Sequence, residues 1–277
     1  MSLTGRNIII TGATSGIGVQ LASVLSANGA NVFIGGRRAE KGDKVAAETR
    51  STFHTVDVAD EASNKAFFAA AAEHFGGEQT VDYILLNAGV EGSAEDASIQ
   101  TLSIENHDYV FGVNVRGFML GLQHGTPMLR KGGKIYCTSG LLSIIPFALN
   151  PTYAATKAAL ESLVRSYAAQ VAQSNDERIR SLSIIAISPC LFATELSNRF
   201  SQKNNIEGEK MAKLHNPSGR VGKPDELAST VLGLLNRQIT GYNSGDVIAC
   251  DADTHFPITE FFGRLKAAQQ TNIVEED

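Results

Sequence analysis

Three glycines near the start of the chain are spaced for binding an anion. Gly12, Gly16 and Gly18 follow a run of three isoleucines and precede an apolar-periodic segment that begins at Val19. A strand, a glycine-rich turn and a helix in this order form a phosphate site, because glycines let backbone N–H groups approach the anion and the helix start adds favourable charge. The same glycines are also explained by the geometry of a strand-to-helix turn alone.

A second pair of residues has side chains suited to proton transfer. Tyr153 and Lys157 are four positions apart in an alanine-rich segment, and in a helix this spacing places both on one face. An exposed pair of this kind would contribute only a few tenths of a kcal/mol to stability. The pair alone therefore does not indicate a catalytic site, and its interpretation depends on the elements around it.

The end of the second expected strand bears on the choice of coenzyme. Gly36, Arg37 and Arg38 follow that strand, and no carboxylate occurs before Glu40. At this place in a dinucleotide fold an acidic residue binds the ribose 2′-hydroxyl, whereas an arginine accommodates a 2′-phosphate. The pattern favours NADP over NAD, with Arg37 as the main phosphate contact because it directly follows the strand. Two solvated arginines at a helix start are the alternative.

The elements that position these residues alternate along the whole chain. This alternation predicts a single doubly wound α/β domain of the Rossmann type, with a parallel sheet of about seven strands. Strands are expected at residues 8–10, 31–35, 51–58, 81–86, 134–139, 181–187 and 245–250. Helices are expected from residue 19, after a cap at Asp60, and at residues 107–129, 153–171 and 224–235. We expect the domain to span residues 1–252 with a substrate lid at about 192–216, and residues 253–277 to be partly disordered.

Composition excludes several classes of protein. A net charge of −5 and a pI near 5.7 argue against nucleic acid as a partner. No apolar run approaches the roughly 18 residues that cross a bilayer, and the polar start of the chain does not resemble a signal peptide. Three scattered cysteines, Cys137, Cys190 and Cys250, indicate reduced thiols in a cytoplasmic protein. No metal-ligand spacing occurs, so no metal site is expected.

Further motifs, in order along the chain, carry a resemblance to a known family. These are Asn87-Ala88-Gly89 after a strand, Asn114 in the middle of a helix, and Pro189 with Thr194 five positions later. Together with the glycines and the Tyr153–Lys157 pair they resemble a classical short-chain dehydrogenase/reductase, from residue 11 to about residue 251. Residues 220–228, with the sequence RVGKPDELA, also resemble the segment before the sixth helix of that family.

The resemblance implies a role for each member of the expected catalytic group. Tyr153 would protonate the alkoxide that hydride transfer leaves, and Lys157 would lower the pKa of the phenol and bind the nicotinamide ribose. Asn114 would hold a water that returns the proton. The expected function is an NADP-dependent oxidoreductase that interconverts a carbonyl and a secondary alcohol on a small, mostly apolar substrate. A homodimer or homotetramer is implied, packed through the helices that hold Asn114 and Tyr153.

Two sets of residues are expected to form the binding sites. The expected cofactor contacts are Gly12, Thr14, Ser15, Gly16, Ile17, Gly18, Arg37, Arg38, Asp57, Val58, Asn87, Ala88, Gly89, Tyr153, Lys157, Pro189, Phe192 and Thr194. The expected substrate-pocket residues, besides those of the lid, are Leu141, Ser143, Ile145, Phe147, Leu191 and Phe192. An apolar run such as 141–147 is also typical of core or of a subunit contact.

One position departs from the family pattern. The family has a serine thirteen positions before the tyrosine, where it binds the substrate carbonyl, and this chain has Gly140 there. Ser139 is one position early and is expected to point to the other side of the strand. We expect Ser143, ahead of Ser139, to supply the missing hydroxyl. The alternative is that no hydroxyl replaces it and the substrate binds by shape, with Tyr153 alone polarising the carbonyl.

The missing serine also leaves a second class of function open. A protein of this family without it could be a non-redox isomerase or cyclase, or a cofactor-sensing binding protein. Retention of Tyr153, Lys157 and Asn114 argues against this reading, because a protein that had lost the reaction would have no reason to keep all three.

Overall fold

In the part of the chain that the structure describes, seven parallel strands form one sheet, which confirms the doubly wound α/β fold. The computed structural model describes residues 2–93, 98–145, 150–203, 208–236 and 244–252. The strands lie in the order β3-β2-β1-β4-β5-β6-β7. Their bounds are β1 Asn7–Thr11, β2 Asn31–Gly36, β3 Thr52–Thr55, β4 Val81–Leu86, β5 Leu129–Thr138, β6 Ser183–Pro189 and β7 Val247–Cys250. The order reverses at β1, so the carboxyl ends of β1 and β4 border the crevice in which such folds bind ligands.

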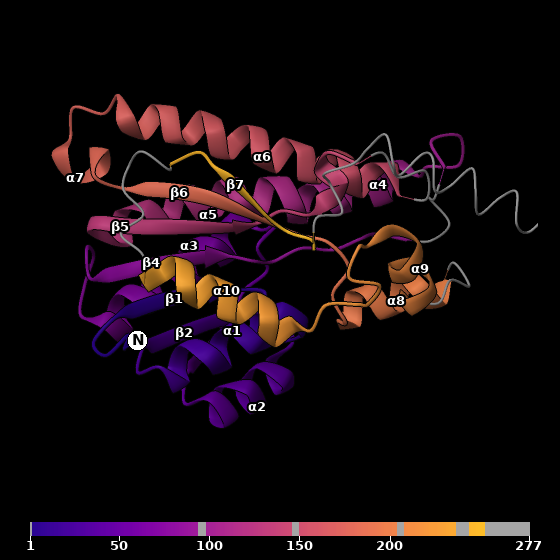
Figure 1. Ribbon diagram of the computed structural model, residues 1–277. Coiled ribbons are helices and arrows are strands. Elements are labelled where there is room, and N and C mark those ends of the chain that lie inside the picture. Colours follow the sequence, from indigo (N-terminus) through magenta and orange to yellow (C-terminus); the bar gives the residue numbers. More distant parts are fainter. Residues whose placement is uncertain (1, 94–97, 146–149, 204–207, 237–243, 253–277) are drawn as a thin grey trace, which may run out of the picture.

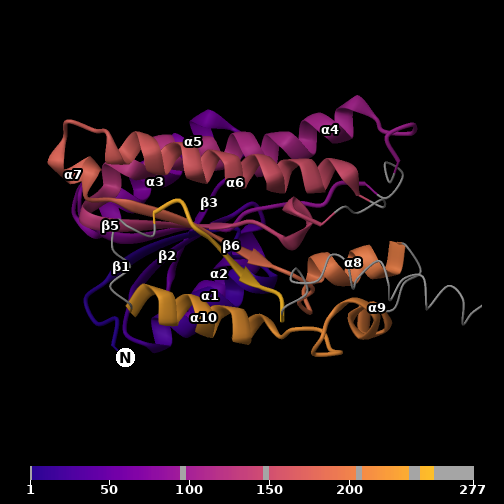
Figure 2. The ribbon, with the colours of Figure 1, turned by 45° about the horizontal axis from the view of Figure 1, so that its top comes forward.

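Helices cover both faces of this sheet (Figures 1 and 2). On one face lie α1 Gly16–Ala27, α2 Ala39–Thr49 and α10 Pro224–Asn236. On the other lie α3 Glu61–Phe75, α4 Ile104–Phe111, α5 Gly117–Gly125 and α6 Pro151–Ala172, with the short α7 Glu177–Arg180 at the far end of α6. Each face buries its own apolar cluster.

Alternation along β1 explains how one strand serves both clusters. Ile8 and Ile10 belong to the apolar cluster on the side of α1 and α10, whereas Ile9 belongs to the cluster on the side of α3 and α6. Successive side chains of a strand point to opposite faces, so a continuous run of isoleucines is what a strand buried on both sides requires. The cap expected at Asp60 is confirmed, since its side chain accepts a hydrogen bond from the Ser63 backbone N–H at the start of α3.

The helix expected at residues 107–129 is found to within a few residues at each end, but it contains a π-helical turn that was not expected. The structure has α4, then a π-helical turn η2 at Gly112–Arg116, then α5 and a short 3₁₀ turn at Thr126–Met128. A π turn inserts one extra residue into a helix and shifts the phase of everything after it. β5 begins at Leu129, five positions earlier than expected.

The segment expected to be a lid contains two helices. They are α8 Glu195–Lys203 and α9 Gly208–His215, and both views place them beyond the carboxyl ends of β6 and β7 (Figures 1 and 2). The expectations for Phe147 and for residues 253–277 lie outside the described residues. Within the described part of the chain, no helix is long and apolar enough to cross a membrane.

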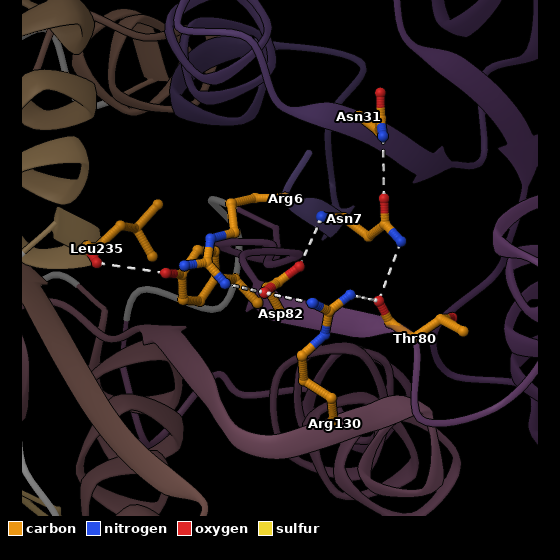
Figure 3. A network of polar contacts seen from close by, with 8 residues as sticks. Arg6, Asn7, Asn31, Thr80, Asp82, Arg130 and Leu235 are labelled. Carbon is orange, nitrogen blue, oxygen red and sulfur yellow. Dashed lines mark hydrogen bonds and ion pairs between the residues drawn. The ribbon is translucent and has the colours of Figure 1, made fainter. Parts of the chain in front are cut away.

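An ion-pair network joins β1 and β4 at the amino end of the sheet, opposite the crevice (Figure 3). The Asp82 side chain is 2% exposed and lies 2.7 Å from Nη1 of Arg6 and 3.3 Å from Nη1 of Arg130. Its second oxygen accepts from the Asn7 backbone N–H at 2.9 Å. A buried carboxylate that is not paired is costly, so these donors make Asp82 part of the framework and not of the site.

Candidate active site

The glycine-rich turn after β1 is built so tightly that side chains could not replace its glycines. Gly12 has φ +70°, and a Cβ there would lie 2.6 Å from Cα of Ala88. A Cβ on Gly18 would lie 2.3 Å from the carbonyl oxygen of Gly12. Asn87 ties the two strand ends together, since its Nδ2 donates to the Gly12 carbonyl at 3.2 Å.

The start of α1 is open to an anion. Ser15 is the N-cap residue, and its side chain makes no capping hydrogen bond to the first turn. The first N–H groups of a helix have no partner within the helix and attract negative charge. A phosphate of a dinucleotide coenzyme would supply the missing acceptors, so the turn at residues 12–18 fits this group.

A cleft of about 640 Å³ runs along the carboxyl ends of the strands. Of the expected cofactor contacts, it is lined by Gly12, Thr14, Ser15, Gly16, Ile17, Arg37, Arg38, Asp57, Val58, Asn87, Ala88, Gly89, Tyr153, Lys157, Pro189, Phe192 and Thr194. Gly18 is not among the lining residues, because it is buried in the turn itself. Leu196, Ser197 and Arg199 of the expected lid also line the cleft, as the sequence predicts. Further lining residues were not among the expected contacts: Gly36, Val56, Val90, Glu91, Gly92, Ser93, Asn106, Tyr109, Val113, Thr138 and Cys190.

The expected substrate pocket is only partly found. Phe192 lines the cleft, but Leu141 and Ile145 are buried in the protein interior and do not line it, and Leu191 is not a lining residue either. A run of apolar side chains after a strand is buried more easily than it is exposed to a polar cleft. For Leu141 and Ile145 the alternative interpretation of this stretch as core is therefore correct.

Tyr153 and Lys157 lie on one face of α6, in the wall of the cleft. Lys157 is 3% exposed, its Nζ donates to the Thr138 carbonyl at 2.8 Å, and Nζ lies 5.4 Å from the ring centroid of Tyr153. Burial lowers the pKa of Lys157 to about 8.

The pKa of Tyr153 moves in the direction opposite to our expectation. Burial raises the pKa of its phenol, and the nearby Glu91 carboxylate raises it further. Removing the phenol from water disfavours the phenolate, and burial is the larger of these two causes. At neutral pH, Tyr153 therefore holds its proton.

Asn114 lies within the π turn and uses its whole side chain to join three elements. Its Oδ1 accepts from the Val90 N–H at 2.8 Å, and its Nδ2 donates to the Val90 carbonyl at 2.9 Å and to Oγ1 of Thr156 at 3.0 Å. Thr156 in turn donates to the Tyr153 carbonyl at 2.7 Å. The amide thus holds the segment after β4 against α6. π turns occur frequently at functional sites.

Gly140 faces the hydroxyl of Tyr153. A Cβ at this position would lie 3.5 Å from Oη of Tyr153 and 3.6 Å from Cγ of Lys157. Its φ of 179° is extended backbone that any residue can adopt. Position 140 is thus the place from which a serine would reach the same substrate atom as Tyr153.

Ser139 and Ser143 are turned toward another side chain. Ser139 donates to Oε1 of Glu161 at 2.8 Å, and Ser143 donates to the same oxygen at 2.5 Å. Neither serine lines the cleft. Ser143 would have to leave Glu161 in order to bind a substrate oxygen, so its catalytic role stays a prediction. The sequence analysis missed Glu161, the partner of both serines, although it lies one helical turn after Lys157; it does not line the cleft.

The two arginines after β2 have different partners. Nη2 of Arg37 donates to the Tyr109 hydroxyl at 2.9 Å, and its guanidinium lies 5.7 Å from the centre of that ring. Nη1 of Arg38 lies 3.0 Å from both carboxylate oxygens of Glu195, and its Nη2 donates to the Thr14 carbonyl at 3.2 Å. Both arginines line the cleft.

Comparison with known proteins gives the family. A family model described as Enoyl-(Acyl carrier protein) reductase matches residues 12–255. Oxidoreductase asL5 of Sarocladium schorii is 31% identical over 252 residues, covering 88% of this chain and 94% of that protein. The crystal structure of levodione reductase has a TM-score of 0.82 at 28% identity and covers 91% of this chain and 99% of that chain. The chain is a classical short-chain dehydrogenase/reductase.

A further relative of this short-chain dehydrogenase/reductase has been solved with a coenzyme. The 3-ketoacyl-(acyl-carrier-protein) reductase from Brucella melitensis, complexed with NADH, has a TM-score of 0.78 at 26% identity and covers 91% of this chain and 99% of that chain. The family binds nicotinamide coenzymes. These matches favour an oxidoreductase over the isomerase, cyclase or sensor considered above.

Proposed function

We propose that this short-chain dehydrogenase/reductase interconverts a carbonyl and a secondary alcohol on a small, mostly apolar molecule with NADP as coenzyme. The observation that carries the proposal is that Tyr153 and Lys157 line the same cleft as the glycine-rich turn at residues 12–18. A candidate proton donor and a turn that fits a dinucleotide phosphate thereby border one cleft. Apolar lining residues such as Val90, Phe192 and Leu196 support the substrate class.

The chemistry divides between coenzyme and protein. When bound, the nicotinamide supplies or accepts the hydride. Tyr153 donates its phenolic proton to the substrate oxygen in the reducing direction and takes it back in the oxidising direction. Its raised pKa keeps that proton in place at neutral pH. Lys157 is mostly charged at pH 7 because its pKa is about 8, so its ammonium stabilises the phenolate that forms.

Asn114 acts on this chemistry through position. By holding the Val90 backbone and Thr156 together, it keeps the wall of the cleft against the first turns of α6. The proton relay through Asn114, Lys157 and a water that the family resemblance implies forms part of the proposal. The proposal also includes assembly as a homodimer or homotetramer and a cytoplasmic location.

The preference for NADP rests on charge at the end of β2. Arg37 contacts a neutral phenol, so this contact does not offset its charge. A guanidinium suits a 2′-phosphate, and hydrogen bonds to charged groups are worth roughly 1.5–3 kcal/mol. No carboxylate stands at residues 36–38 to bind a 2′-hydroxyl instead.

The experiment that tests the function compares two tyrosine variants of the same helix. Tyr153→Phe should abolish NADPH consumption with a panel of simple ketones, while NADPH binding followed by fluorescence stays within about twofold of wild type. Tyr167→Phe is the matched control, because Tyr167 lies further along α6 with its hydroxyl bonded to Thr126, away from the cleft. If Tyr153→Phe kept most of its activity, the proposed mechanism would be wrong.

A further inference from the structure

The first turn of α8 is bound to the end of β2 by an ion pair. Oε1 and Oε2 of Glu195 both lie 3.0 Å from Nη1 of Arg38, and Nζ of Lys41 lies 3.5 Å from Oε1. The hydrogen bond from Arg38 is the main reason that the pKa of Glu195 lies below its ordinary value. Arg38 thereby favours the charged form of this carboxylate. The contact joins residues that are 157 positions apart in the sequence.

Each of the three nitrogens of the Arg38 guanidinium has a protein partner. Nη1 binds Glu195, whereas Nε and Nη2 reach Oγ1 of Thr14 at 3.3 Å and Nη2 also reaches its carbonyl. Arg38 lines the cleft at the place where the proposed 2′-phosphate would lie. A carboxylate and a phosphate offer the same charge sign and the same kind of oxygen acceptor. Both cannot occupy one guanidinium edge at once.

The neighbouring Arg37 provides an internal contrast. Among the described residues, its contacts are with the hydroxyl and ring of Tyr109, which carry no charge. A phosphate can therefore bind Arg37 without displacing an anion. At Arg38 it must first displace Glu195.

Glu195 is also connected to the rest of the cleft. Thr194 and Leu196, its neighbours on either side, line the cleft, as do Ser197 and Arg199 further along α8. Thr194 packs close to the glycine-rich turn, since a Cβ on Gly16 would lie 3.3 Å from its Cβ. The Glu195–Arg38 pair therefore belongs to a segment that itself lines the cleft.

We propose that Glu195 is a coenzyme-specificity residue that competes with the 2′-phosphate for Arg38. A coenzyme with a 2′-hydroxyl leaves the Glu195–Arg38 pair intact, whereas one with a 2′-phosphate must break it. Glu195 thus reduces the preference for NADP that the two arginines create. The inference rests on the proposed coenzyme site, and it names the residue that sets the ratio between the two coenzymes.

Binding of two adenosine probes tests this without turnover. 2′,5′-ADP carries the 2′-phosphate and 5′-ADP lacks it, so the ratio of their affinities by titration calorimetry isolates the contribution of that phosphate. Glu195→Gln should raise the ratio in favour of 2′,5′-ADP at least fivefold. Glu226→Gln is the matched control: Glu226 lies in the first turn of α10, forms an equivalent pair with Arg220 and does not line the cleft. It should leave the ratio unchanged.

A second comparison separates competition from simple repulsion. In an Arg38→Ala background, Glu195→Gln should no longer change the ratio, because the group for which the two anions compete is gone. An equal rise in that background would overturn the competition, as would an unchanged or lower ratio in the single variant.

The affinities of the wild-type protein for the two probes test the coenzyme proposal separately from the role of Glu195. A wild-type protein that binds 5′-ADP more tightly, but whose ratio still rises in Glu195→Gln, would contradict the NADP preference and support the role of Glu195. If neither probe bound to any variant, both proposals would be wrong.

Discussion

The hydroxyl of Ser143 lies 2.5 Å from Oε1 of Glu161, and Ser139 donates to the same oxygen at 2.8 Å. Glu161 is 4% exposed, so its carboxylate depends on these protein donors in place of water. The two serines lie on either side of Gly140. A buried carboxylate thus holds both sides of the position at which the family has its serine, and it shapes the loop that faces Tyr153.

This contact changes what we expect of Ser143. Replacing Ser143 with Ala removes one donor from a buried carboxylate, which should lower the free energy of unfolding by about 1–3 kcal/mol. The change in kcat/KM should stay below about threefold, because the hydroxyl is committed to Glu161 and not to the substrate. Urea denaturation and steady-state kinetics on the same preparation measure the two effects.

The opposite pattern would favour the relocated hydroxyl expected from the sequence. A fall in kcat/KM of about a hundredfold, the usual cost of one lost oxyanion donor, would mean that Ser143 leaves Glu161 when substrate binds. Ser181→Ala serves as the control, because its hydroxyl donates to the Arg178 carbonyl outside the cleft.

Gly140→Ser should increase activity on simple ketones. The added Cβ would lie 3.5 Å from Oη of Tyr153, at a backbone conformation open to any residue. Its hydroxyl would therefore become a second donor to the substrate oxygen, and kcat/KM should rise by about tenfold or more. Gly140→Ala adds the same Cβ without the donor and should bring no gain. Equal effects of the two variants on kcat/KM would show that the added Cβ, and not the hydroxyl, causes the change.

Burial of Lys157 gives the fold a specific pH dependence. Its pKa is lowered to about 8 in the folded protein from an ordinary value of 10.5. Between these values the unfolded chain binds more protons than the folded one, so stability rises with pH through that window and is constant below it. From pH 7.5 to 9.5, wild type should gain roughly 1–2 kcal/mol relative to Lys157→Met.

Chemical denaturation at several pH values measures this difference. Subtracting the variant removes the contribution of the tyrosines, which titrate at higher pH in both proteins. Parallel pH curves for the two proteins would contradict the prediction and would mean that Lys157 keeps its ordinary pKa in the fold.

Asp82 is expected to matter for stability and not for catalysis. Asp82→Asn removes the charge that binds Arg6 and Arg130 and should lower the free energy of unfolding by about 1–3 kcal/mol, since the arginines are half-exposed and recover water. Activity of the folded fraction should stay near wild type. Asp108→Asn, on an exposed carboxylate paired with His107, is the control that should change stability by less than about 0.5 kcal/mol.

Local backbone requirements explain why much of the cleft could be predicted from the sequence. Gly12 needs a left-handed conformation and a close approach to Ala88, and such needs select one residue type at one position. The four-residue spacing of Tyr153 and Lys157 likewise places two side chains on one helix face whatever surrounds them. Features of this kind are determined by a few residues that are close together in the sequence.

Contacts between distant segments could not be predicted in this way. Glu161 lies one turn beyond Lys157, but only the packing of the 139–143 loop against α6 makes it a buried acceptor of two hydroxyls. The pairing of Glu195 with Arg38 depends on where α8 docks. The π turn at Asn114 was missed for a related reason, because one inserted residue breaks the 3.6-residue period that identifies a helix.

Arg37 provides the most direct test of the coenzyme preference. The wild type should bind NADPH at least about tenfold more tightly than NADH. The reason is that the 2′-phosphate forms a charge-assisted hydrogen bond with the Arg37 guanidinium, whose described partner, Tyr109, is neutral. Arg37→Ala should weaken NADPH binding by about tenfold and leave NADH binding within about twofold. Tyr109→Phe is the matched control: it removes the hydroxyl that orients Arg37 but keeps the ring and the charge, so most of the NADPH preference should remain. Equal affinities of the wild type for both coenzymes, or an Arg37→Ala variant that binds NADPH as well as wild type does, would remove the basis for an NADP-dependent enzyme.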